Sequence, residues 1–213
     1  MMKRICLLAL SLIMLLSMAG CGSSDAADSG QRKNGEKTSA PAQMADKPQT
    51  ETGKALVVYF SCTGNTKRAA QYASDILGAD LYEITPKVPY TSNDLNYHDE
   101  NTRATVEQKD SSARPAIVGD VVNFEQYDTV VLAFPIWWGQ EPRILDTFME
   151  SHDFVGKTIV PMCTSNSSDM GSSADYLKAL TKGSAKWLKG KRFPVNVTKE
   201  DINSWLNDIG LTK

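Results

Sequence analysis

Apolar runs alternate with helix-patterned segments from residue 54 to the end of the chain. Residues 55–60, 127–134 and 157–162 are dominated by apolar side chains, as in parallel strands that are buried on both faces. Weaker strand patterns cover residues 80–84 and 185–189. The segments between the strands repeat apolar residues at helical spacing, and we predict helices over residues 66–77, 142–151, 172–180 and 199–209. This alternation predicts a doubly wound α/β fold with a five-stranded parallel sheet between two layers of helices.

Three segments of distinctive composition follow the ends of strands, at residues 61–66, 135–140 and 164–171. Since the carboxyl ends of parallel strands meet at one edge of a sheet, we expect a single ligand site that draws on all three. The first segment offers short donor side chains and a glycine that lets an anion approach the backbone. It also begins a helix, where a phosphate is favoured. Residues 61–66 therefore predict a monophosphate pocket.

The second segment contains two consecutive tryptophans, Trp137 and Trp138, between Pro135 and Gly139. Adjacent side chains diverge, so we expect one indole to point inward and the other to cover a loop or a ligand. An indole face suits a planar aromatic ring; the alternative is that both tryptophans pack under the following helix. The third segment is serine-rich and suits the polar edge of a heterocycle, although on its own it equally fits an ordinary loop.

The N-terminal sequence has the pattern of a processing signal. A basic pair, Lys3 and Arg4, precedes an apolar run over residues 5–18, which is about 14 residues long and shorter than the roughly 20 of a membrane span. Met18-Ala19-Gly20-Cys21 resembles the lipobox of bacterial lipoproteins, in which the cysteine carries the lipid. An ordinary secretory signal and an intact membrane anchor are the alternatives.

This interpretation divides the chain into three parts. Residues 1–20 are the expected lipoprotein signal peptide, and residues 21–53 hold the lipidated Cys21 and a polar tether too poor in apolar residues to fold. Residues 54–213 are the folded domain. We predict an extracytoplasmic protein held at the cell membrane by a lipid on Cys21.

Tyr-Phe-Ser-Cys-Thr-Gly-Asn-Thr at residues 59–66 and Pro-Ile-Trp-Trp-Gly at residues 135–139 together resemble the signatures of the flavodoxin family. The resemblance implies strand order 2-1-3-4-5 and non-covalently bound FMN. It assigns the 5′-phosphate to the first segment, namely Ser61, Thr63, Gly64, Asn65 and Thr66. It assigns the isoalloxazine ring and ribityl chain to Pro135, Ile136, Trp137, Trp138 and Gly139, and the outer ring edge to Thr164, Ser165, Asn166 and Gly171.

Members of that family often sandwich the ring with an aromatic residue of the third loop, which this chain lacks. Tyr90 or Tyr97, from the long insertion at residues 85–118, is the expected substitute. The middle of the insertion, residues 101–109, fits a helix. In the implied strand order, one strand separates the two strands that lead to Cys62 and Cys163, so these are about 9–10 Å apart, beyond the roughly 7 Å that a disulfide allows between Cα atoms. We therefore expect both thiols to remain free.

The resemblance favours an electron carrier that exchanges electrons with a redox partner protein. The alternatives are an FMN-dependent reductase that moves hydride from a nicotinamide cofactor to a quinone or flavin, and a flavin-binding lipoprotein without enzymatic activity. The formal net charge of −2 gives no argument for a nucleic-acid partner. The sequence shows neither metal-ligand spacing nor a Ser-His-acid arrangement, so we predict no metal site and no catalytic side chain of the chain's own. A basic run from Lys182 to Arg192 fits a solvated face, or alternatively a contact with a partner or lipid.

Overall fold

Three long parallel strands form the centre of the sheet: β1 (Lys54–Tyr59), β5 (Tyr127–Pro135) and β6 (Thr158–Thr164). The computed structural model describes residues 53–212, so the predicted signal peptide, Cys21 and the tether up to residue 52 lie outside the described residues. A short strand β2 (Asp80–Glu83) flanks β1 on one side, and β7 (Lys186–Trp187) and β8 (Lys191–Phe193) flank β6 on the other. The order β2-β1-β5-β6-β7 confirms the predicted doubly wound α/β fold.

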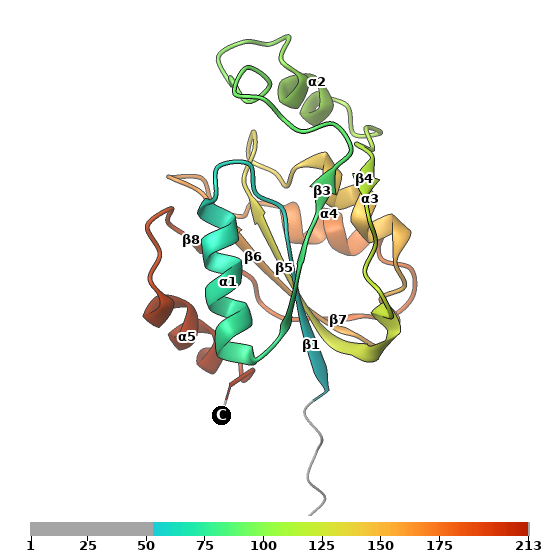
Figure 1. The fold of residues 1–213 in the computed structure, drawn as a ribbon, viewed down its shortest axis with the longest axis vertical. Helices are drawn as coiled ribbons and strands as arrows, with labels where there is room; N and C mark the ends of the chain where they lie inside the picture. The colour runs from blue at the N-terminus through green and yellow to red at the C-terminus, as the bar shows by residue number, and fades with distance from the viewer. Residues whose placement is uncertain (1–52, 213) are drawn as a thin grey trace, which may run out of the picture. The chain divides into compact units, whose positions relative to one another are not determined.

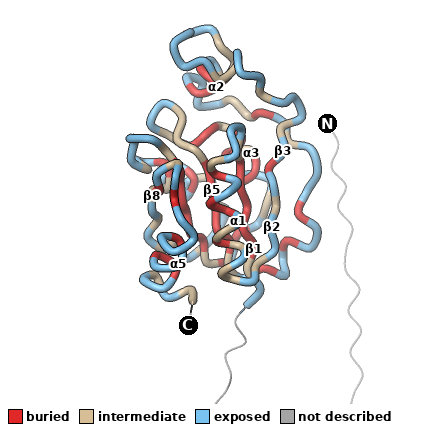
Figure 2. The backbone as a smooth tube through the Cα atoms, turned by 60° about the vertical axis from the view of Figure 1, so that its left-hand side comes forward, coloured by how far each residue is buried: buried red, intermediate tan, exposed pale blue. Residues whose placement is uncertain are grey.

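Side chains of the central strands alternate between two cores, one on each face of the sheet. Leu56 and Val58 face the core that is completed by α3 (Arg143–Ser151) and α4 (Ser173–Leu180). Val57 and Tyr59 face the core completed by α1 (Asn65–Leu77) and α5 (Lys199–Asp208). Figure 1 shows these two helix layers with the sheet between them, and Figure 2 shows that burial concentrates on the central strands and the sheet-facing sides of the helices. Each of these helices carries an apolar stripe, and that stripe packs against one face of the sheet.

The last strand position is split, contrary to the single strand predicted over residues 185–189. β7 pairs with the first half of β6 and β8 with its second half. Leu188 donates to the Ile159 carbonyl (2.9 Å), so by alternation the nitrogen of Pro161 faces the same outer strand. Because proline has no N–H, the ladder loses a hydrogen bond there. Gly190 passes this point so closely that a Cβ on it would lie 2.7 Å from the Pro161 carbonyl oxygen.

The insertion at residues 85–118 leaves and returns through two paired segments that the sequence did not reveal. β3 (Thr85–Pro86) and β4 (Ile117–Val118) form a short antiparallel pair. Between them, the predicted helix is present as α2 (Arg103–Lys109), which lies beyond the carboxyl ends of the sheet strands in Figure 1. A 3₁₀ turn, η1 (Phe124–Gln126), precedes β5.

None of the helices within residues 53–212 combines the length and the apolar character that crossing a membrane requires. Cys62 is exposed, Cys163 is buried and both thiols are free, as expected from the strand order.

Candidate functional site

The three predicted segments meet at the carboxyl edge of the sheet. β1, β5 and β6 are adjacent and parallel, so the loops that follow them leave the same edge. Thr66 Oγ1 lies 2.7 Å from Thr164 Oγ1, which joins the first loop to the third. The Ile136 N–H donates to the Thr164 carbonyl (3.1 Å), which joins the second loop to the third. The sequence therefore predicted correctly which segments come together.

The first loop presents the open N-terminus of α1. Gly64 occupies the cap position with φ +83°, and within the described residues no side chain caps this helix and no acidic residue lies in its first turn. The first backbone N–H groups of α1 are therefore available to an anion, which the helix dipole also favours. Gly64 has open space where a Cβ would lie, so a ligand can approach the backbone closely. This donor set fits a phosphate.

The hydroxyl groups of this loop keep protons to donate. The Gly64 N–H donates to Ser61 Oγ (3.1 Å), and Asn65 Nδ2 donates to Thr63 Oγ1 (3.2 Å). Both hydroxyls act as acceptors in these bonds, so their own O–H groups remain free. Thr66 is buried and shares a single hydrogen bond with Thr164, so one of these two hydroxyls also retains a donor.

The second loop turns sharply and holds one indole outward. The N–H and C=O groups of Trp137 and Gln140 bond to each other at 2.8 and 2.9 Å, around central residues Trp138 (φ +47°) and Gly139 (φ +78°). Two positive φ values are the mark of a type I′ turn, and this conformation is strained for a bulky residue such as tryptophan. Trp138 is 39% exposed, so a strained turn here presents a large aromatic face to solvent.

Trp137 packs against the core. Its ring meets Phe60 at 5.5 Å and Tyr90 at 5.3 Å between centroids, both edge to face. Ile136 also packs against the core, and Pro135 ends β5. The two indoles lie edge to face with each other, 6.4 Å between centroids, with Trp137 as the partly buried support and Trp138 as the open platform.

Tyr90 does not have the free face that a flavin sandwich needs. Arg103 lies over its ring at 4.1 Å from the centroid, and its hydroxyl donates to Glu107 (2.5 Å). Tyr97 is 68% exposed and stacks on His98. Of the two proposed substitutes, Tyr97 is the exposed one, whereas Tyr90 is partly buried and already covered by Arg103.

The third loop is held by a residue that the sequence analysis treated only as part of a basic run. Arg192, at the centre of β8, donates to the carbonyls of Ser165 (3.2 Å) and Asn166 (2.7 Å) and to Ser165 Oγ (3.2 Å). These carbonyls are therefore occupied, and the Ser165 N–H donates to the Phe193 carbonyl (3.1 Å), so the loop offers its N–H groups from Asn166 onward. Gly171 (φ +55°) closes the loop against the second one, because a Cβ on it would lie 3.1 Å from the Gly139 carbonyl oxygen.

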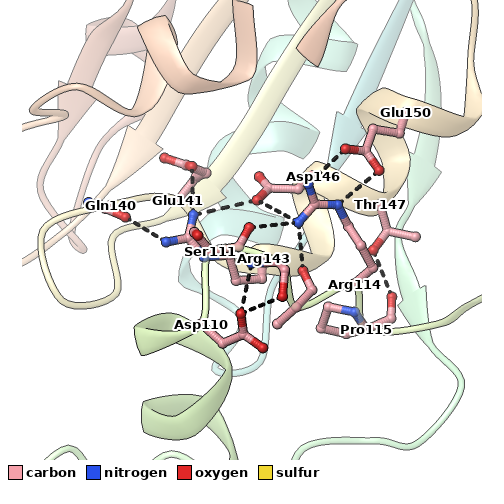
Figure 3. Close-up of polar contacts among 12 residues, drawn as sticks. Asp110, Ser111, Arg114, Pro115, Gln140, Glu141, Arg143, Asp146, Thr147 and Glu150 are labelled. Atoms are coloured by element: carbon pink, nitrogen blue, oxygen red, sulfur yellow. Dashed lines mark hydrogen bonds and ion pairs between the residues drawn. The ribbon is translucent and has the colours of Figure 1, made fainter. Parts of the chain in front are cut away.

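A partly buried charged network lies behind the second and third loops (Figure 3). Arg143 Nη1 is 3.5 Å from both Glu141 Oε1 and Asp146 Oδ2. Arg114 approaches Asp146 at 3.6 Å and binds Glu150 through two nitrogens, at 2.7 and 2.9 Å. Burial raises the pKa of Asp146 to about 6, against the opposing charges of Arg143 and Arg114. Sequence reasoning missed this network, since each member alone looks like an ordinary surface charge.

Comparison with known proteins agrees with this fold. A sequence model of the flavodoxin family matches residues 54–209. A candidate flavoprotein from Bacteroides eggerthii DSM 20697 is 42% identical over 73% of this chain and 97% of its own, with a TM-score of 0.68. One from Bacteroides uniformis ATCC 8492 is 41% identical over 73% and 98%, with a TM-score of 0.69.

A more distant structure shares the fold. It is a flavoprotein from Lactobacillus acidophilus NCFM, solved in complex with FMN, which is 18% identical over 72% of this chain and 98% of its own, with a TM-score of 0.55. None of the curated proteins matches the chain closely enough to count as a relative.

Proposed function

Because the chain belongs to the flavodoxin family, we propose that its folded domain binds FMN and uses it for electron transfer. The observation that carries this proposal is the uncapped N-terminus of α1 at the same sheet edge as the exposed indole of Trp138. An anion site beside an aromatic platform suits a phosphorylated planar ring. The Lactobacillus acidophilus flavoprotein, which has the same fold, was solved with FMN.

Each part of the site has a separate task. The N–H groups at the start of α1, with the hydroxyls of Ser61 and Thr63, hold the phosphate. The turn at Trp138 and Gly139 covers the ring, and the N–H groups of the loop held by Arg192 meet its polar edge. FMN, when bound, supplies the redox chemistry, while the protein tunes it by hydrogen bonds, stacking and charge.

Substitution of Trp138 tests the ring assignment. Trp138→Ala removes the exposed platform, and we expect FMN affinity measured by fluorescence quenching to fall by about tenfold, since aromatic stacking contributes about 0.5–1.5 kcal/mol beyond burial. Trp187→Phe is the control. Trp187 lies on β7, which pairs with the first half of β6, away from the carboxyl edge of the sheet where Trp138 lies. Equal affinities in the wild type and Trp138→Ala would refute the assignment.

Anaerobic reduction tests electron transfer. For a carrier we expect reduction in two well-resolved one-electron steps in the visible spectrum, and slow reduction by NADH or NADPH. Rapid oxidation of either nucleotide in the presence of a quinone would instead indicate a reductase. If the purified chain holds no FMN at micromolar concentrations, both redox functions are excluded.

We also propose that the domain works outside the cytoplasm, tethered through a lipid on Cys21. The support is the basic head, the short apolar run and the lipobox-like residues 18–21. Cys21→Ser should abolish incorporation of labelled fatty acid and move the protein from the membrane fraction to the soluble fraction. Unchanged lipid labelling would overturn this assignment.

A further inference from the structure

Glu141 is a fully buried carboxyl group directly behind the exposed turn of the ring loop. It follows Gln140, which closes that turn, and precedes Pro142, the cap residue of α3. Its backbone carbonyl accepts a hydrogen bond from Gln108 Nε2 of α2 (2.9 Å). The segment after the turn is therefore held by the turn before it, by α3 after it and by the hydrogen bond from Gln108.

The side chain of Glu141 is poorly compensated. Neither of its carboxylate oxygens has a hydrogen-bond partner of good geometry among the described residues. Gln108 Oε1 and Ser173 Oγ, both buried, are likewise unpartnered in that part of the chain. A buried carboxylate without hydrogen bonds is costly, whereas a protonated carboxyl group is neutral and can itself donate to an acceptor.

The charges around Glu141 do not balance its ionised form. Arg143 approaches it only at 3.5 Å and is shared with Asp146 at the same distance. Arg114 serves Asp146 and Glu150, and Asp110 is the further acidic group near these two arginines. Burial, and to a smaller extent the charge of Asp146, raise the pKa of Glu141 to about 7. The approach of its own backbone N–H, of the Ser173 hydroxyl and of the Arg143 charge opposes this rise without cancelling it.

Arg143 connects Glu141 to the ring loop. Its Nη2 donates to Gln140 Oε1 (2.9 Å) and to the Gln108 carbonyl (3.2 Å), while Nη1 faces the two carboxylates. The same guanidinium therefore lies between Glu141 and Gln140, and an ionised Glu141 would attract it more strongly than a protonated one. The charge on Glu141 therefore bears on the residue that closes the turn at Trp138.

From this geometry we propose that Glu141 is a positioning residue that takes up a proton when FMN binds, so that flavin affinity depends on pH. The proposal rests on the proposed function, because it concerns the same ring loop. FMN excludes water from the loops in front of Glu141 and adds negative charge to the same edge of the sheet. Both effects disfavour a nearby carboxylate, so the protein with flavin holds the proton more firmly than the free protein.

The test compares three forms of the full chain, kept in detergent because of its apolar N-terminal segment: wild type, Glu141→Gln and Glu150→Gln. FMN dissociation constants are measured by fluorescence quenching from pH 6 to pH 9. For each unit by which binding raises the pKa of Glu141, affinity falls about tenfold over this range. We expect that loss in the wild type and in Glu150→Gln, whose substituted residue is exposed, and a flatter profile in Glu141→Gln. The FMN phosphate itself titrates at roughly 6, but its contribution is common to all three proteins.

Two further measurements keep the inference falsifiable if Glu141→Gln does not fold. Calorimetric titration of the wild type with FMN at pH 7.5, in buffers of different ionisation enthalpy, should show net proton uptake. Carbon-13 NMR of the flavin-free protein should show one glutamate carboxyl that titrates near neutral pH and is absent from Glu141→Gln. Parallel pH profiles, no proton uptake, or a Glu141 carboxyl that stays ionised at pH 5 would each overturn the proposal. Failure of all three proteins to bind FMN would instead reject the proposed function, and the NMR titration would still decide the protonation of Glu141.

Discussion

The hydrogen bond between Thr66 and Thr164 should hold the first and third loops together, and a double-mutant cycle can measure it. Both threonines are almost fully buried, and their hydroxyl oxygens lie 2.7 Å apart. Thr164→Val keeps the shape of the side chain but leaves the Thr66 hydroxyl buried without a partner, which costs about 1–3 kcal/mol of unfolding free energy. In a domain of this size, each kcal/mol lowers Tm by about 2–4 °C.

Urea unfolding of the wild type, both single variants and the double variant gives the coupling energy. We expect Thr66→Val and Thr164→Val to be destabilised by similar amounts. The double variant should lose clearly less than their sum, because no hydroxyl is then left unpaired, with a coupling energy of about 1 kcal/mol or more. Strictly additive losses would refute the reasoning, since they would mean that the two hydroxyls do not depend on each other.

Three other substitutions test separate parts of the molecule. Lys157→Met should lower the unfolding free energy in urea by about 1–3 kcal/mol, because its buried Nζ donates to the carbonyls of Phe124 (3.1 Å) and Tyr127 (2.5 Å); an unchanged midpoint would contradict this. Arg192→Gln should weaken FMN binding severalfold in a fluorescence titration while Tm changes little, since the third loop loses the donor that orders it. The difference in unfolding free energy between the wild type and Glu141→Gln should fall as pH rises from about 4.5 to about 7. The unfolded chain releases the Glu141 proton at a lower pH than the folded protein does. Urea midpoints of the two proteins that move in parallel with pH would contradict this.

The parts of the fold that sequence predicted are those set by local pattern. The apolar runs of β1 and β5 and the apolar stripe of α1 are each visible as local patterns in the sequence, whereas the order of the strands was expected from the resemblance to the flavodoxin family. The three loops could be placed together because the end of a parallel strand fixes the edge to which a residue belongs. The outward turn of Trp138 is likewise expected from two adjacent bulky residues.

The features that sequence did not reveal depend on contacts distant along the chain. Glu141 precedes a helix, where an exposed glutamate is favourable, and only the packing of α2 and α4 around it makes it buried. Arg192 holds the third loop because β8 pairs with the second half of β6. That pairing could have been suspected from Pro161, because a proline within a buried strand removes a donor on one side.

The split at Pro161 also affects how copies of this protein meet. An exposed outer strand offers unpaired backbone groups that can pair with another chain, and long straight edges aggregate. Here the outer position is divided into two short pieces, and Lys186, Lys189 and Lys191 occur along it. A second molecule therefore finds neither a continuous backbone ladder nor a neutral surface on that side. Replacing Pro161 and Gly190 by β-branched residues would favour a longer outer strand. A longer outer strand would in turn promote association between molecules at high concentration.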